Sequence, residues 1–146
     1  MTLRLSFTGD LCLGLRVRDT LAEQGLQRLF AGLGNSLAHS DAVVTNLECY
    51  LSPLAVPGRK GRMAAPPEFA DALPAAGIRV VGLANNHVLD HGASGLATTL
   101  AALDARQILH YGAGSDLTAA ERVLTLEMGG QRIALLGACD FSPFHA

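Results

Sequence analysis

The chain has 146 residues and a formal net charge of −2, with 49% hydrophobic and 16% charged residues. This length predicts one domain, residues 1–146, with a single core. Basic residues are scattered apart from a short group at 59–62, so nucleic acid is not an expected partner. No apolar run reaches the roughly 20 residues of a transmembrane segment, and the start lacks a signal-peptide pattern, which predicts a cytoplasmic location.

Apolar periodicity predicts strands that alternate with helices. The expected strands are residues 3–10, 41–48, 78–83 and 107–111. The expected helices are residues 16–23, 26–37, 66–77 and 91–106, with a short helix or turn at 116–121. The last apolar runs, 123–127 and 132–136, flank two glycines and predict a hairpin. Together these elements predict an α/β fold, mostly parallel, with helices on the faces of the sheet.

Several local signals refine these elements. Gly32 and Gly34 weaken the second helix. Pro74 predicts a kink or an early end in the third helix, because it removes a backbone donor. Asp90 is placed to cap the fourth helix. The stretch 50–65, with two prolines, two glycines and three basic residues, is expected to be an irregular loop on the substrate side.

Polar side chains stand at the ends of three predicted strands. Asp10 ends the first, Asn46 and Glu48 end the second, and Asn86 and His87 follow the third. Since the carboxyl ends of parallel strands meet at one edge, about 4.8 Å apart, these groups could share a metal ion. A pair of metals would need a bridging carboxylate from Asp10 or Glu48. His87 could then donate a proton to a leaving group.

Structural roles are the alternative for several polar residues. Asp10 and Glu48 could cap loops, and Asn85 could tie a turn with its side chain. The other histidines are expected to be solvated or satisfied locally; they are His39, His91 and His110. A Gly-Ala-Gly at 112–114 lacks a third glycine before a helix, which argues against a dinucleotide site.

The three cysteines are odd in number and far apart in the sequence. Cys12, Cys49 and Cys139 all lie after or near strand ends, so a shared zinc ion is one alternative. No C-x-x-C spacing supports it. The sequence therefore favours small reduced thiols over zinc ligands or disulfides.

Four motifs, in order, resemble the signatures of the CapA family of capsule or poly-γ-glutamate synthesis proteins. They are GDLCLG at 9–14, NLEC at 46–49, APPE at 65–68 and LANNHVLDHG at 83–92. The Asn-Asn-His stretch is the most specific, and the resemblance covers nearly the whole chain. It implies the fold of calcineurin-like metallophosphatases, a layered sheet with helices on its faces and a site for two divalent metal ions.

The resemblance also implies roles for particular residues. Asp10 and Asn86 match metal ligands, and His87 matches the residue that assists catalysis. Glu48 stands where the superfamily usually has a bridging Asp, and Cys12 where it has a histidine. The metal, Mn, Fe, Zn or Mg, is left open. Further histidine signatures are expected in a second half, so the fold and site are predicted to be incomplete, with a carboxy-terminal half absent.

Three hypotheses follow. The first is a metal-dependent hydrolase of metallophosphatase type, acting on a phosphate ester or an anionic polymer. Its predicted site has Asp10, Glu48 and Asn86 as ligands and His87 as the acid. The second is a non-catalytic component of capsule-polymer assembly or export, with capsule-synthesis proteins as partners. The third is an inactive fragment that lacks the second half of the site. Family members are often anchored outside the membrane, which competes with the predicted cytoplasmic location.

Overall fold

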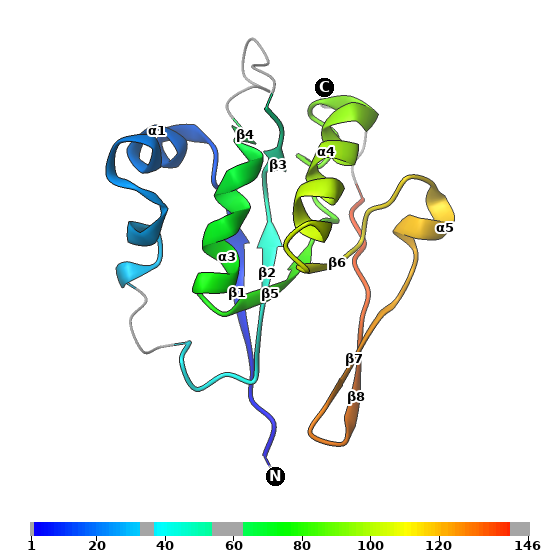
Figure 1. The fold of residues 1–146 in the computed structure, drawn as a ribbon. Helices are drawn as coiled ribbons and strands as arrows, with labels where there is room; N and C mark the ends of the chain where they lie inside the picture. The colour runs from blue at the N-terminus through cyan, green and yellow to red at the C-terminus, as the bar shows by residue number, and fades with distance from the viewer. Residues whose placement is uncertain (1, 33–36, 54–62, 141–146) are drawn as a thin grey trace.

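A parallel four-stranded sheet forms the centre of the protein (Figure 1). The computed structural model describes residues 2–32, 37–53 and 63–140. Across the sheet the order is β1 (Leu5–Leu11), β2 (Ala42–Leu47), β5 (Ile78–Gly82) and β6 (Leu109–Tyr111). Each of the four predicted strands is therefore present, and the predicted α/β fold is confirmed.

The central strands are buried on both faces, which explains their β-branched runs. Val43 and Val81 lie in the larger hydrophobic cluster, and Val44 and Val80 lie in the smaller one. The edge strand β1 is less covered, and its Phe7 side chain is 63% exposed. The strand predicted here is present, but burial does not alternate along it, since residues 7–10 are all exposed.

Helices cover one face of the sheet (Figure 1). They are α1 (Leu15–Gln24), the 3-10 turns η1 (Leu26–Arg28) and η3 (Pro67–Asp71), α3 (Ala72–Ala75) and α4 (Gly92–Asp104). Their apolar residues, such as Leu21, Leu73 and Leu103, pack with Val43 and Val81 in the larger cluster. Most of the buried apolar side chains lie on this face.

The hairpin predicted at the end of the sequence is confirmed. It consists of β7 (Leu124–Met128) and β8 (Gln131–Leu135), which form an antiparallel sheet of their own. Gly129 and Gly130 have φ values of +56° and +75°, which fit the two-residue turn. Leu126 and Leu135 pack with the smaller cluster and so cover the other face of the central sheet. Before the hairpin comes a short helix, α5 (Leu117–Ala120).

The prediction of one helix over residues 26–37 is wrong. Over residues 26–32, the described part of this range, the chain forms short 3-10 turns at η1 (Leu26–Arg28) and at residues 31–32, after Gly25 turns the chain with a φ of +87°. Glycines at 25, 32 and 34 weaken a helix here more than the apolar stripe supports it, and residues 33–36 lie outside the described residues. The stripe itself still packs: Leu26 and Phe30 lie against the larger cluster.

Two other predictions are corrected in part. The helix expected at 66–77 is the 3-10 turn η3 followed by α3, which stops one residue after Pro74; the expected early end is confirmed. The expected irregular loop at 50–65 begins and ends in a short parallel pair, β3 (Tyr50–Leu51) with β4 (Ala64–Ala65). Its basic group lies outside the described residues.

Candidate functional site

The strand ends that carry the polar motifs lie side by side, as the sequence predicted. Asp10 of β1 is in register with Asn46 of β2, and Asn46 is in register with Gly82 of β5. The Asn46 amide donates a hydrogen bond from Nδ2 to Asp10 Oδ1 at 2.9 Å. The carboxyl edge of the parallel sheet therefore gathers groups from three consecutive strands.

Two carboxyl groups meet at this edge. The side chains of Asp10 and Glu48 lie near enough to shift the pKa of each other. The Asn46 amide, followed by Glu48, lowers the pKa of Asp10 below its ordinary value. Burial, followed by the contact with Asp10, raises the pKa of Glu48. Because two carboxylates in contact repel each other, the pair favours a proton or a cation between them.

A buried amide holds this edge in place. Asn85 donates from Nδ2 to Asn46 Oδ1 at 3.1 Å and to the Leu47 carbonyl at 3.0 Å. Its Oδ1 accepts a hydrogen bond from the backbone N–H of His87 at 3.0 Å. The turn-tying role considered for Asn85 is confirmed. The same amide also links the end of β5 to β2, and through Asn46 to Asp10.

His87 is paired with a residue whose role the sequence analysis missed. Its Nδ1 lies 2.9 Å from Asp90 Oδ2, and the side chains are 29% and 14% exposed. The prediction that Asp90 caps the helix is wrong: His91 is the N-cap of α4, without a side-chain cap. The turn over 86–91 brings Asp90 back toward the ring, with its backbone N–H donating to the His87 carbonyl at 3.1 Å. The His-x-x-Asp spacing of these two residues was the sequence signal that could have predicted their contact.

Asn86 has a different environment from its neighbour Asn85. Its side chain is exposed, and within the described residues it makes no hydrogen bond. In the same ranges, no three His, Cys, Asp or Glu side chains are close enough to hold a metal ion. The donor chemistry of Asp10 and Glu48 fits a hard cation. The ligand set of Asp10, Glu48 and Asn86 stays a prediction.

Two of the three cysteines join this edge. Cys49 is buried, Cys12 is partly buried and Cys139 is exposed. The neighbouring Cys49 thiol, against the opposing effect of burial, lowers the pKa of Cys12 to about 7, while the pKa of Cys49 rises. Glu48 and His87 also act electrostatically on the Cys12 thiol, so it lies near them. Cys12 and Cys49 are far apart in the sequence, but the adjacent strands β1 and β2 bring them to the same edge of the sheet.

A second histidine supports the helix that follows the site. The His91 ring lies 5.6 Å from the Tyr50 ring, centroid to centroid, and its Nδ1 is 3.4 Å from Ser52 Oγ. A Cβ on Gly95 would lie 2.5 Å from His91 Cβ, so only glycine lets α4 pack this closely. The local satisfaction expected for His91 is confirmed, and His110 similarly contacts Asp104 at 3.1 Å.

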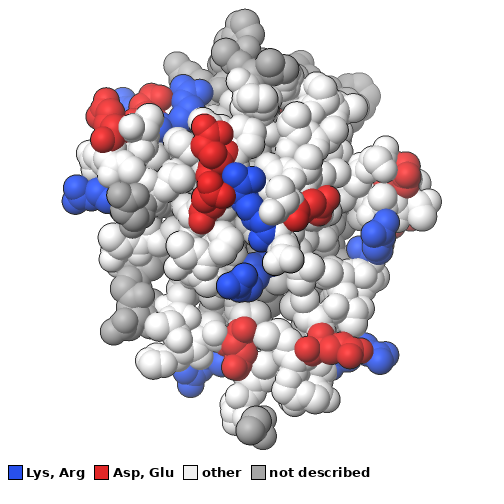
Figure 2. Space-filling view, viewed as in Figure 1, with Lys and Arg blue, Asp and Glu red and all other residues white. Residues whose placement is uncertain are grey.

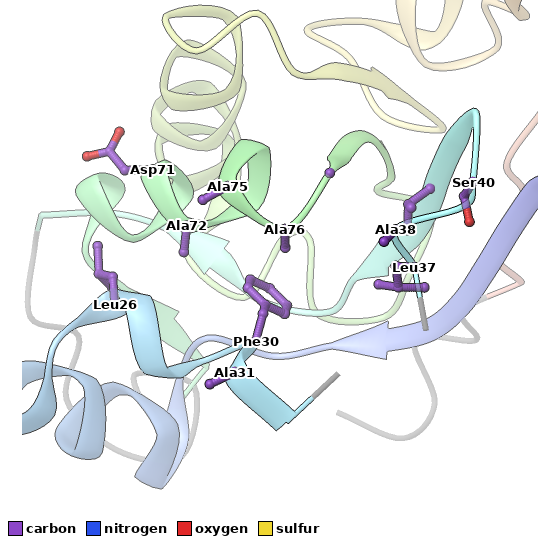
Figure 3. A pocket seen from close by; sticks show the side chains of 12 residues that line it. Leu26, Phe30, Ala31, Leu37, Ala38, Ser40, Asp71, Ala72, Ala75 and Ala76 are labelled. Atoms are coloured by element: carbon purple, nitrogen blue, oxygen red, sulfur yellow. The ribbon is translucent and has the colours of Figure 1, made fainter. Parts of the chain in front are cut away.

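A cavity among the described residues lies away from this edge. It has a volume of about 640 Å³ and is lined mainly by apolar side chains, including Leu26, Phe30 and Ala76 (Figure 3). Ser40 and Gly77 also line it; Ser40 lies two residues before β2, and Gly77 lies directly before β5. The cavity therefore lies toward the amino ends of the strands, opposite the polar groups.

Charges do not gather into one patch on the face that the helices cover. In Figure 2, basic and acidic side chains alternate across a mostly uncharged surface. This distribution gives no support to nucleic-acid binding on that face. Among the described residues, no helix has the length and apolar character needed to cross a membrane.

The fold and this edge define a class: an α/β protein with a parallel sheet whose strand ends carry an acid pair and a His–Asp pair. The model of the family described as bacterial capsule synthesis protein PGA_cap matches residues 4–146. The chain belongs to this family. The resemblance to CapA proteins that the four motifs indicated is confirmed.

Curated relatives match over different lengths. The chain is 28% identical to capsule biosynthesis protein CapA of Bacillus anthracis, over 94% of the chain but 35% of that protein. It is 27% identical to PGA biosynthesis protein CapA of Bacillus subtilis (strain 168), over 96% of the chain and 38% of that protein. A probable polyglutamine synthesis accessory protein of Mycobacterium tuberculosis is 43% identical over 72 residues. The chain thus spans little more than a third of the two Bacillus proteins.

Proposed function

We propose that this chain contributes one part of a metal-dependent hydrolase site that cleaves phosphate esters during capsule or polyglutamate synthesis. The observation that carries the proposal is the His87–Asp90 pair, 2.9 Å apart, on the sheet edge that also bears Asp10 and Glu48. An oriented imidazole beside an acid pair is what a hydrolase with a cationic cofactor requires. The names of the relatives, which concern capsule and polyglutamine synthesis, support the biological setting.

Asp10 and Glu48 are the residues that would hold a divalent cation, with Asn86 as the third predicted ligand. The two carboxyl groups act on each other electrostatically, so a cation between them would relieve their repulsion. Asn46 orients Asp10 through its 2.9 Å hydrogen bond, and Asn85 orients Asn46. When bound, a divalent cation supplies charge stabilisation at a phosphoryl oxygen and lowers the pKa of water.

His87 would serve as the general acid. Asp90 engages Nδ1, so the carboxylate fixes the orientation of the ring. Nε2 is then the nitrogen that donates a proton to the leaving oxygen. Asp90 acts through His87 and is a positioning residue. Burial of the Asp90 carboxylate, 14% exposed, strengthens this pairing because water competes with it less.

Hydrolysis of a generic phosphodiester, bis-p-nitrophenyl phosphate, tests the proposal. We expect turnover that depends on Mn²⁺ or another divalent cation and is abolished by chelation. His87→Asn should reduce kcat about 100- to 10,000-fold, the range of general acid catalysis. The matched control is His39→Asn, since His39 is exposed and lies just before β2, away from the carboxyl edge. Unchanged kcat in His87→Asn, or no turnover with any divalent cation, would contradict the proposal.

A non-catalytic role is the second candidate. It is favoured by the finding that residues 2–32, 37–53 and 63–140 assemble no group of three His, Cys, Asp or Glu ligands. In that case the chain would hold an anionic polyamide for its synthase partners. Binding of poly-γ-glutamate that is independent of divalent cations and unaffected by His87→Asn would favour this role over hydrolysis.

A further inference from the structure

The pairing of β1 with β2 brings two thiols together next to the acid pair. The last registered residues of the two strands are Leu11 and Leu47, and the Glu48 N–H donates to the Leu11 carbonyl at 2.9 Å. Cys12 directly follows Leu11, and Cys49 lies two residues after Leu47. The Leu13 N–H donates to Cys49 Sγ at 3.4 Å, which places the Cys49 sulfur against the backbone next to Cys12. Neighbouring backbones in a parallel sheet lie within the span that a disulfide bridges.

The two thiols differ in burial, and this difference determines which of them reacts first. Cys49 is 1% exposed, and the Leu13 N–H donates to its Sγ at 3.4 Å. Cys12 is partly buried and is the thiol that a dissolved reagent reaches first. Cys139, the third cysteine, is exposed and offers an internal control.

We propose that Cys12 and Cys49 form a redox-active dithiol, which closes reversibly into an intramolecular disulfide beside the candidate site. The co-reactant is a small disulfide. The Cys12 thiolate attacks one sulfur of the small disulfide, forming a mixed disulfide and releasing one thiolate. Cys49 gives its proton to solvent and attacks Sγ of Cys12, which releases the second thiolate. Two protein thiols are oxidised, and one small disulfide is reduced to two thiols.

Closure would change both the fold and the site. The new bond would tie the end of β1 to the segment after β2, closing a loop of residues 13–48 and restricting the unfolded chain. It would also remove the free thiol of Cys12, which lies near Glu48 and His87. This inference concerns the chemistry of the two thiols and does not rest on the proposed hydrolase activity.

Equilibration with defined ratios of oxidised and reduced glutathione tests the inference, using the chain with Cys139→Ser. We expect a species lighter by about 2 Da than the dithiol, with the peptides containing Cys12 and Cys49 linked. Reduction with dithiothreitol should restore the original mass. Closure should raise Tm by about 5 °C or more, from the loop that it restrains. In Cys49→Ser, only a glutathione adduct at Cys12 is expected.

A second reagent keeps the inference falsifiable if the oxidised form is poorly populated. Phenylarsine oxide bridges only thiols that lie close together, so one equivalent should protect Cys12 and Cys49 from alkylation. It should protect neither remaining thiol in Cys12→Ser or Cys49→Ser. A stable glutathione adduct at Cys12 with Cys49 still free, or a disulfide to Cys139 in the unmodified chain, would overturn the inference. So would the absence of both the disulfide and the arsenical bridge.

Discussion

The core beneath α4 and the carboxyl edge of the sheet treat polar groups in opposite ways. In the core, Thr99 is 1% exposed, and its Oγ1 accepts from the Leu51 N–H and donates to the Gly95 carbonyl, both at 2.8 Å. Every buried polar side-chain atom among the described residues has a partner. At the edge, two carboxyl groups, Asp10 and Glu48, face each other. The polar groups of the core have hydrogen-bond partners within the fold, whereas the repulsion between the two carboxyl groups at the edge is not balanced by the fold.

This difference indicates where stability is held and where function is placed. Like charges in contact destabilise a folded protein, and proteins retain them where binding relieves the repulsion. The two neighbouring asparagines repeat the contrast within one turn. Asn85 is buried and makes three hydrogen bonds, while Asn86 is exposed. If the contrast is correct, substitutions in the two regions should affect different measurements.

The largest stability effect is expected for Asn85→Ala. This change removes the amide from three hydrogen bonds and leaves the buried Leu47 carbonyl and Asn46 without that donor, at a cost of about 3 kcal/mol. Asn86→Ala is the matched control and should change stability by less than about 0.5 kcal/mol. Urea unfolding measures both. Equal losses of unfolding free energy in the two variants would mean that Asn85 is no more important for stability than Asn86.

Thr99→Val tests the core half of the comparison. Valine keeps the shape but leaves the Leu51 N–H without its acceptor, so we expect a loss of about 2 kcal/mol. Thr98→Val is the control, because it makes the same substitution at the neighbouring position of the helix. The Thr98 side chain makes one hydrogen bond, to the Gly95 carbonyl at 2.9 Å. Its loss should stay below about 0.5 kcal/mol. A difference between the two variants smaller than the error of the unfolding measurement would argue against a tightly coupled core.

Glu48→Gln tests the edge through pH. The pKa of Glu48 is raised in the folded state above the ordinary value of 4.5, so its stabilising contribution is present below that pH and is lost as pH rises through the raised pKa. The lowered pKa of Asp10 acts oppositely, losing stability as pH falls below its ordinary value of 3.8. In a chelating buffer, Tm of the unmodified chain should therefore fall relative to Glu48→Gln as the pH rises above about 4.5.

Divalent cations provide the complementary measurement for this variant. Mn²⁺ should raise Tm of the unmodified chain at pH 7, because a cation relieves the repulsion between the two carboxylates. It should raise Tm of Glu48→Gln less, since one of the carboxylates is gone. A Tm difference that does not vary with pH or with Mn²⁺ would show that Asp10 and Glu48 are not electrostatically coupled.

The smallest expected effect concerns the reactivity of Cys12. The neighbouring Cys49 thiol lowers the pKa of Cys12 to about 7, so the alkylation rate of Cys12 should rise with pH around that value. Cys49→Ala removes this thiol and should move the rise to higher pH. Cys49→Ser keeps a hydroxyl donor and should move it less. An identical profile in all three proteins would show that the thiol contact is absent in solution.

The sequence predicted the carboxyl edge because its signals are local. A β-branched run such as Val80–Val81 reports burial on both faces, and the parallel arrangement then brings strand ends to one edge. The hairpin was predictable for the same reason, since Gly129 and Gly130 supply the positive φ values of its turn. Where the local signals conflicted, as between the apolar stripe and the glycines of residues 26–37, periodicity alone gave the wrong helix.

The sequence by itself thus determined the α/β class, the family and the strand ends at which Asp10, Glu48 and His87 stand. Only the tertiary structure decided which side chains became partners. A strand end specifies an edge, but the chain direction after it determines whether Asp90 caps a helix or returns to His87. The contact of Cys12 with Cys49 depends on strand order, which pairs residues far apart along the chain. Periodicity along one segment contains no information on either.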